Sequence, residues 1–262
     1  SMALVEVGGS PARFAIPRSL VSAVEGLSGT IVLAPQDETD TGTLAAGCLE
    51  ELLNLGRNAN LVILGSGPSP SQETRDLTRR LCEQLERPLL LTGGVLSGEV
   101  EDVAEISRRM GLTAWLLQPS EMSRLFNQTL EKTLKDPLGS VQTLCRETGA
   151  IVALRAKPAL IGLPDGRVFV DLTDRFLGSD GRRCNVLPGL IGAMSRRGLP
   201  LAEAVRTGVF LRGIAGDLAA RREGGARPSA RQIVKALPAA IASFREDYSG
   251  LTSHLPGNIE II

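Results

Sequence analysis

A loop of small and polar residues runs into an apolar helix between residues 176 and 198. The predicted helix carries apolar residues at helical spacing, namely Val186, Leu187, Leu190, Ile191 and Met194, so that one apolar face meets a core. The first N–H groups of a helix have no internal partner, and the helix dipole adds about half a positive charge there. The loop from Gly181 to Asn185 is therefore expected to hold an anion such as a phosphate or an oxyanion.

A second polar loop follows the apolar run at residues 60–64 and begins with Gly65, Ser66 and Gly67. In an open α/β sheet, ligands bind in the crevice at the carboxyl ends of the parallel strands. This Gly/Ser turn is therefore a second candidate for contact with a ligand.

The elements that must position both loops alternate along the chain. Apolar runs predict strands at residues 30–35, 60–64, 88–91, 113–118 and 150–155, with the first and last of them buried. Helical spacing predicts helices at residues 44–55, 71–85, 101–110, 137–148, 201–222 and 229–244. A Pro-Asp-Gly turn at residues 164–166 predicts a hairpin. The fold class is therefore α/β, with a mostly parallel sheet, helices on both faces and a hairpin near the edge.

Composition excludes several classes of function. Lys plus Arg and Asp plus Glu each number 29 among 262 residues, so electrostatics gives no reason to expect nucleic acid or an anionic membrane as a partner. The pairs Arg108-Arg109 and Arg221-Arg222 are expected to be solvated helix faces. No apolar stretch reaches the roughly 20 residues needed to span a bilayer.

Cysteine and histidine usage narrows the chemistry further. The four cysteines are dispersed without a CxxC pair, which favours a reducing, cytoplasmic location and gives no indication of a zinc site. The single histidine, His254, excludes histidine-dependent triads and multi-histidine metal sites. We expect one domain over residues 1–248, a tail over residues 249–262 and no protein-borne metal site.

Two motifs in the second half of the chain resemble a known family. Gly213, Ala215, Gly216 and Asp217 match an HGxAGD motif, and Val186, Leu187 and Gly189 match the end of a GTGD-V-L-x-G motif. Both motifs are typical of the ADP- or ATP-dependent NAD(P)H-hydrate dehydratases of the ribokinase superfamily. The resemblance covers roughly residues 28–246 and implies a ribokinase-like fold whose N-terminal part is shortened.

The resemblance also implies where the reaction would occur, and the chain departs from the family there. The Gly, Thr, Gly and Asp of the first motif fall on Arg182, Arg183, Cys184 and Asn185. The family aspartate takes the proton of the substrate hydroxyl, whereas an amide is no useful base. Loss of such a base typically costs a factor of about 10² to 10⁴ in rate. Asp180, Asp174 and Glu121 are candidate substitute bases.

Other family positions extend the candidate site. The family GPGLG loop corresponds to residues 65–69, and its TPHPGE turn corresponds to residues 116–121, which places Gln118 and Glu121 on the substrate side. Glu121 alternatively serves the first turn of a helix, where acidic residues are favourable. The family aspartate that ends the strand at residues 88–91 is Thr92 here. The implied nucleotide-binding residues are Arg155, Gly181, Arg182, Arg183 and Cys184.

Three functions stay open at this point. The first is a homologue that binds a nucleotide or dinucleotide, with its dehydratase activity weak or lost. The second is an active dehydratase or small-molecule kinase with a substitute base, and the third is a structural interaction protein with a filled cleft. The resemblance implies ATP or ADP and Mg²⁺ as cofactors and a homo-oligomer as the assembly.

Overall fold

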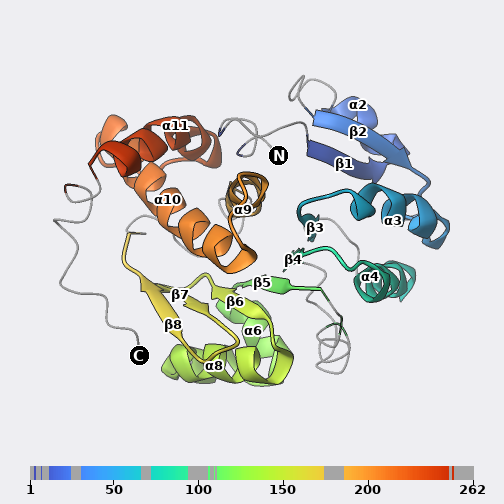
Figure 1. Ribbon diagram of the computed structural model, residues 1–262, viewed down its shortest axis with the longest axis horizontal. Coiled ribbons are helices and arrows are strands. Elements are labelled where there is room, and N and C mark those ends of the chain that lie inside the picture. Colours follow the sequence, from blue (N-terminus) through green and yellow to red (C-terminus); the bar gives the residue numbers. More distant parts are fainter. Residues whose placement is uncertain are drawn as a thin grey trace.

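The structure, a computed structural model, describes residues 3, 7, 12–24, 31–65, 72–93, 106, 109, 111–173, 186–247 and 250. The apolar runs form a six-stranded sheet in the order β3-β4-β5-β6-β7-β8 (Figure 1). These strands are β3 (Val62–Leu64), β4 (Leu89–Thr92), β5 (Thr113–Leu117), β6 (Ile151–Leu154), β7 (Ala159–Gly162) and β8 (Val168–Asp171).

The sheet is parallel from β3 to β6 and antiparallel from β6 to β8. The β7–β8 turn confirms the predicted hairpin, and Gly166 adopts the left-handed φ of +92° that its tight turn requires. β4, β5 and β6 are buried along their whole length, as expected for strands with helices on both faces.

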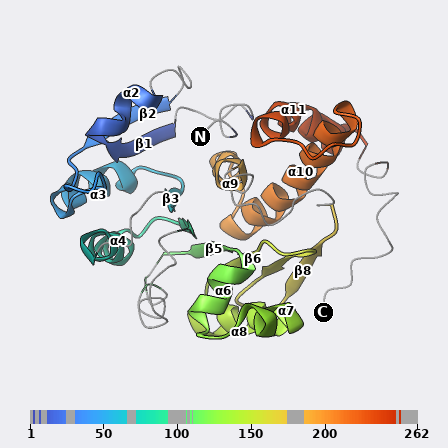
Figure 2. The ribbon, with the colours of Figure 1, turned by 180° about the vertical axis from the view of Figure 1, so that it is seen from behind.

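Helices cover the two faces of this sheet (Figures 1 and 2). One core cluster joins Leu90 and Leu116 to α9 (Val186–Arg196), α10 (Leu201–Arg222) and α11 (Ala230–Glu246). The other joins Leu91 and Trp115 to the opposite set. That set comprises α3 (Leu49–Arg57), α4 (Gln72–Gln84), α6 (Pro119–Leu125) and α8 (Pro137–Thr148), with the short α7 (Leu130–Lys135) before α8. The predicted α/β architecture is therefore confirmed.

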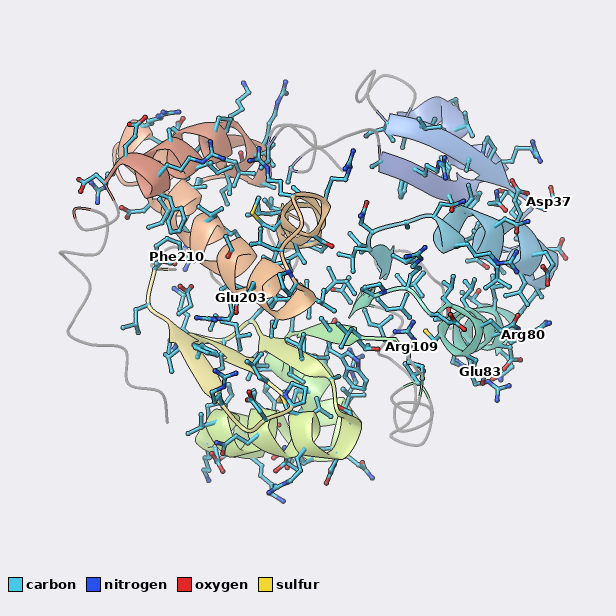
Figure 3. All side chains as sticks on the ribbon, viewed as in Figure 1. Asp37, Arg80, Glu83, Arg109, Glu203 and Phe210 are labelled. Atoms are coloured by element: carbon cyan, nitrogen blue, oxygen red, sulfur yellow. The ribbon has the colours of Figure 1, made fainter. Side chains whose placement is uncertain are left out.

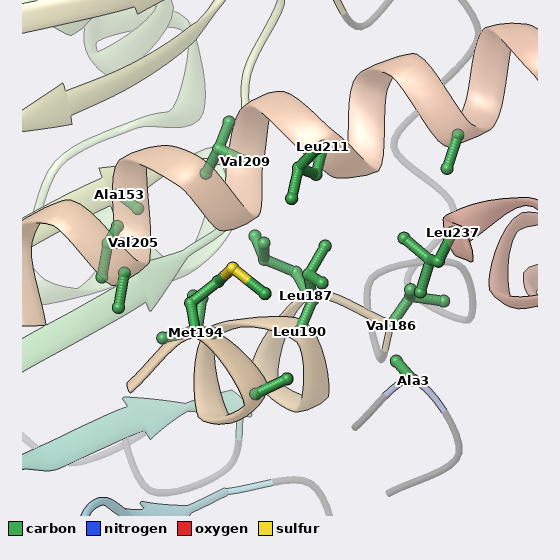
Figure 4. Packing of buried hydrophobic residues seen from close by; sticks show 14 of the residues in the cluster. Ala3, Ala153, Val186, Leu187, Leu190, Met194, Val205, Val209, Leu211 and Leu237 are labelled. Atoms are coloured by element: carbon green, nitrogen blue, oxygen red, sulfur yellow. The ribbon is translucent and has the colours of Figure 1, made fainter. Parts of the chain in front are cut away.

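The helix pair α9 and α10 forms the centre of the first cluster (Figure 4). Leu187, Leu190 and Met194 of α9 face Val205 and Val209 of α10. The predicted apolar residues of α9 all lie in this core, and burial extends beyond the one predicted face, because every residue from Val186 to Met194 is buried. A helix that is apolar all round is typical of a position between other layers of the core.

A separate two-stranded sheet pairs β1 (Ala12–Pro17) with β2 (Ile31–Gln36) in parallel. Two short helices, η1 (Arg18–Leu20) and α2 (Val21–Val24), follow β1, and η2 (Ala46–Cys48) leads into α3. The prediction of a buried strand at residues 30–35 was wrong in its burial, since Val32 of β2 is 50% exposed. Among the described residues β2 pairs only with β1, so it is not part of the six-stranded sheet whose faces the helices cover.

The prediction of solvated basic helix faces is confirmed at one arginine pair and wrong at the other. Arg221 is 64% exposed and forms an ion pair with Asp217, as expected for a solvated face. The prediction was wrong for Arg109, whose guanidinium donates hydrogen bonds to backbone carbonyls of residues 82–112. Arg108 and most of the helix predicted at residues 101–110 lie outside the described residues.

The described cysteines are free thiols buried in the core. Burial raises the pKa of Cys82 to about 12 and that of Cys145 to about 11. Since the thiolate is the reactive form, both are inert packing residues near neutral pH. None of the helices within the described ranges is long and apolar enough to cross a membrane.

Candidate functional site

The carboxyl ends of four parallel strands lie side by side at one edge of the six-stranded sheet. Strand register pairs Leu64 with Leu91, Thr92 with Leu116, and Leu117 with Leu154. The N–H of Arg155 continues the ladder by donating to the carbonyl of Leu117 at 2.8 Å. The residues that end or follow these strands therefore form a row at this edge: Gly65, Thr92, Gln118 and Arg155.

At one end of this row, the backbone of Gly65 lies directly against Thr92. A Cβ at residue 65 would overlap both the carbonyl oxygen and the side-chain methyl of Thr92, so the close approach requires glycine here. Thr92 itself is 5% exposed, and its register partner Leu116 belongs to the cluster built on α9 and α10. The start of the Gly/Ser loop is therefore fixed to the end of β4, on the α9 side of the sheet.

Glu121 lies in the first turn of α6, just beyond β5. Its Oε2 accepts a hydrogen bond from the backbone N–H of Gln118 at 2.6 Å and lies 3.6 Å from Nη2 of Arg155. The Glu121 side chain is only 9% exposed. Of the two sequence interpretations of Glu121, the structure shows the helix cap, and the same carboxylate also serves as the counter-charge of Arg155.

Arg155 follows β6, and its side chain is 8% exposed. The ion pair with Glu121 is loose at 3.6 Å, and the buried Nε has no hydrogen-bond partner among the described residues. A guanidinium carries five N–H donors, and a buried donor without a partner is costly. Its fork of donors matches phosphate and carboxylate oxygens, so Arg155 is equipped to bind an anion at this edge.

The end of β8 lies at the same edge as the end of β6, because both strands run antiparallel to β7. The buried carboxylate of Asp171 accepts a hydrogen bond from the hydroxyl of Thr173 at 2.8 Å, and Thr173 packs against Gly213 of α10. The sequence did not predict the contacts of Thr173 with Asp171 and Gly213, although Gly213 lies in a matched motif. That glycine was the available signal, since it marks a place where another segment approaches the helix closely.

The remaining predicted site residues lie outside the described residues: Ser66, Gly67, Asp174, Asp180, Gly181, Arg182, Arg183, Cys184 and Asn185. The described residues that flank that loop in the sequence are Thr173 before it and Val186 after it. Gly65, Gln118, Glu121 and Arg155 are therefore the predicted residues that the structure brings together. Within the described ranges, no three His, Cys, Asp or Glu side chains gather in a way that would hold a metal ion.

The sheet with its terminal hairpin, its helices on both faces and a polar row at the carboxyl edge define a ribokinase-like α/β protein. No family model matches the chain. A solved structure of the ADP/ATP-dependent NAD(P)H-hydrate dehydratase from Bacillus subtilis shares this fold, with a TM-score of 0.75 and 15% identity over 93% of this chain and 84% of that one. A ribokinase-like superfamily protein from Enterococcus faecalis gives a TM-score of 0.71 at 14% identity, over 93% of this chain and 80% of that one.

The chain is also similar in sequence to curated relatives. The chain is 31% identical to the bifunctional NAD(P)H-hydrate repair enzyme Nnr of Thermofilum pendens, over 96% of this chain and 48% of the relative. It is 25% identical to the ADP-dependent (S)-NAD(P)H-hydrate dehydratase of Neisseria meningitidis, over 82% of this chain and 76% of the relative. The chain therefore belongs to the NAD(P)H-hydrate dehydratase family. It spans about half the length of the bifunctional relatives that it matches.

Proposed function

We propose that this chain binds a nucleotide at the carboxyl edge of its sheet and that its ATP- or ADP-dependent dehydratase activity is weak or lost. The observation that carries the proposal is the buried guanidinium of Arg155, whose Nε has no hydrogen-bond partner in the described part of the chain and whose ion pair with Glu121 is long. The relatives support a nucleotide as the anion, since one is named ADP-dependent and a Bacillus subtilis structure was co-crystallised with ATP and Mg²⁺.

Arg155 would contact a phosphate of the nucleotide, together with the loop from Gly181 to Cys184 at the start of α9. Mg²⁺ prefers oxygen ligands and would reduce the negative charge of the phosphates when bound with them. The carboxylate at this edge, Glu121, is already engaged by Gln118 and Arg155. The described edge therefore fits the phosphates, and Mg²⁺ would be held mainly through the nucleotide.

The chain lacks an effective proton acceptor at the position where the family reaction requires one. Asn185 occupies the position of the family aspartate, and an amide does not take a proton near neutral pH. Glu121 is a poor substitute base, because its carboxylate is buried and bound by a backbone N–H and an arginine. Asp180, the other candidate that we retain, lies next to the loop at residues 181–185.

Two alternatives predict different measurements. An active dehydratase or small-molecule kinase with Asp180 as its base is favoured by the 31% identity to a repair enzyme. A structural interaction protein with a filled cleft would bind no nucleotide. The following two experiments separate the three functions.

Calorimetric titration with ADP and with ATP, each with and without Mg²⁺, is expected to show saturable binding to the unmodified chain. Arg155→Gln removes the charge and most donors, so binding should weaken by at least about tenfold. Arg124→Gln is the matched control, because Arg124 is exposed on the same helix that carries Glu121. Equal affinity of the Arg155→Gln and unmodified chains would overturn the role of Arg155, and no binding to either would favour the filled cleft.

Turnover is expected to be weak or undetectable when the chain is incubated with hydrated NADH and ATP or ADP, followed by the absorbance of reduced nicotinamide. Asn185→Asp restores a carboxylate and should raise the rate by a factor of about 10² to 10⁴. Rapid turnover that Asp180→Ala abolishes would contradict this expectation and identify an active enzyme with a substitute base.

A further inference from the structure

Strand β8 is the last strand of the six-stranded sheet (Figure 1). Among the described residues it pairs only with β7, and in an antiparallel ladder alternate residues point their N–H and C=O groups away from the partner strand. Most of the strand is apolar, namely Val168, Phe169 and Val170. Proteins usually cover or shield such an edge, because it is a template for pairing. The outer edge of β8 is therefore a place where a further strand can bind.

The two faces of β8 have different surroundings. Phe169 packs against the cluster that contains α10, and the guanidinium of Arg206 on that helix lies 3.7 Å from the centre of its ring. Nη1 of Arg206 donates to Glu203 at 2.8 Å, and the Arg206 side chain is 35% exposed. Val170, by contrast, packs against the cluster on the α8 side of the sheet. A strand beside β8 would thus meet a cation on one face and apolar side chains on the other.

The segment of residues 258–262, which lies outside the described residues, has the matching pattern. Ile259 and Ile261 are β-branched and alternate with Glu260, which is typical of a strand with one apolar face. When Glu260 lies beside Phe169, both isoleucines lie on the α8 side, whichever direction the segment runs. The arginine over the Phe169 ring carries five N–H donors, so it can hold this second carboxylate beside its present partner.

The segment is tethered close enough to reach this edge. α11 packs on α10, and α10 packs on β8. Each packing layer is about 10 Å thick, so about 20 Å separates α11 from the strand. Gly250, just beyond α11, precedes Asn258 by eight residues (258 minus 250), which extend over about 26 Å. A short tether gives an effective concentration of about 1 mM, which favours this segment over a separate protein.

We propose that residues 258–262 pair with the outer edge of β8 as a further strand. In this arrangement Glu260 lies beside Phe169 and faces Arg206. β8 precedes the loop that contains residues 181–185, the predicted anion-binding residues, so the added strand stabilises the element from which that loop departs. The proposal does not depend on which ligand the chain binds at its sheet edge.

The first test uses hydrogen–deuterium exchange to compare the unmodified chain with a chain that ends at Gly257. The amides of β8 that point away from β7 should exchange at least about tenfold faster in the shortened chain, because they lose their acceptors. β5 is the internal control, since β4 and β6 pair with it on both sides, and its exchange should not change. Equal exchange of β8 in the two chains would overturn the proposal. An equal acceleration in β5 and β8 would also overturn it, because that indicates a general loss of stability.

The second test is Glu260→Lys in the unshortened chain. It places a positive charge beside Arg206, so the same β8 amides should exchange faster by at least about threefold. Glu246→Lys is the matched control, because Glu246 is exposed at the end of α11 and the change of charge is the same. Equal effects of the two variants would contradict the placement of Glu260. Protection of β8 that falls on dilution would assign the strand to a second copy and overturn pairing within one chain.

Discussion

Arg109→Ala is expected to lower the free energy of unfolding by about 3 kcal/mol. The Arg109 guanidinium donates to five backbone carbonyls, those of Cys82, Leu85, Arg87, Gly111 and Leu112, and to the hydroxyl of Thr113. One of these carbonyls, that of Cys82, belongs to the last turn of α4, where carbonyls have no partner inside the helix, and that of Leu85 directly follows the helix. Removing the side chain leaves several partly buried acceptors unsatisfied, each at a cost of about 1 kcal/mol or more.

Urea unfolding of the variant, followed by circular dichroism, measures this loss directly. Arg109→Lys should recover only part of it, because an ammonium group lacks the planar fork that reaches separate carbonyls. Arg80→Ala is the matched control, since Arg80 lies exposed on the outer side of α4 (Figure 3), and its effect should stay within about 0.5 kcal/mol. Equal stability of the Arg109→Ala and Arg80→Ala variants would contradict the role of Arg109 as a clamp.

Gly213→Ala should destabilise the protein by a similar amount, about 3 kcal/mol. A Cβ at residue 213 would lie 2.7 Å from the Thr173 Cβ and 3.0 Å from its backbone carbonyl carbon, and it would overlap the hydroxyl. Because part of this contact is backbone, no change of rotamer relieves it, and α10 must move away from the end of β8. Overpacking of this kind costs about 1–3 kcal/mol or more.

Gly216→Ala is the control within the same motif and the same helix. A Cβ at residue 216 meets no atom of the described residues within 4 Å, so this change should leave stability unchanged or raise it by up to about 1 kcal/mol through helix propensity. Thermal unfolding of the two variants side by side distinguishes the sites. If Gly213→Ala melted at or above the temperature of Gly216→Ala, the close approach of Thr173 to α10 would be wrong.

Elements with local signals could be predicted from the sequence. Asp136 caps α8 through its side chain, and Gly149 ends it with a φ of +63°, as their residue types indicated. α10 spans Leu201–Arg222, the range predicted from apolar spacing. These features depend on neighbours within a few residues, so propensity and capping determine them.

Features that depend on distant segments were missed. Arg109 looked like a surface residue because three of its acceptors, the carbonyls of Cys82, Leu85 and Arg87, lie 22 to 27 residues away along the chain, and only the fold brings them to it. The exposure of β2 could not be predicted either, since an apolar run does not reveal whether a second layer covers it. In the candidate site, the pairing of Glu121 with Arg155 required the register of β5 and β6. The roles of Asp180 and of residues 181–185 stay predictions, because they lie outside the described residues.

The position of Glu121 makes the backbone amide of Gln118 sensitive to anion binding at this edge of the sheet. One carboxylate is shared between the amide that begins α6 and the guanidinium of Arg155. An anion that draws Arg155 away would leave that carboxylate with a stronger hold on the Gln118 amide. The NMR chemical shift of the Gln118 amide proton would then change when an anion binds, so that binding could be followed without any label near the ligand.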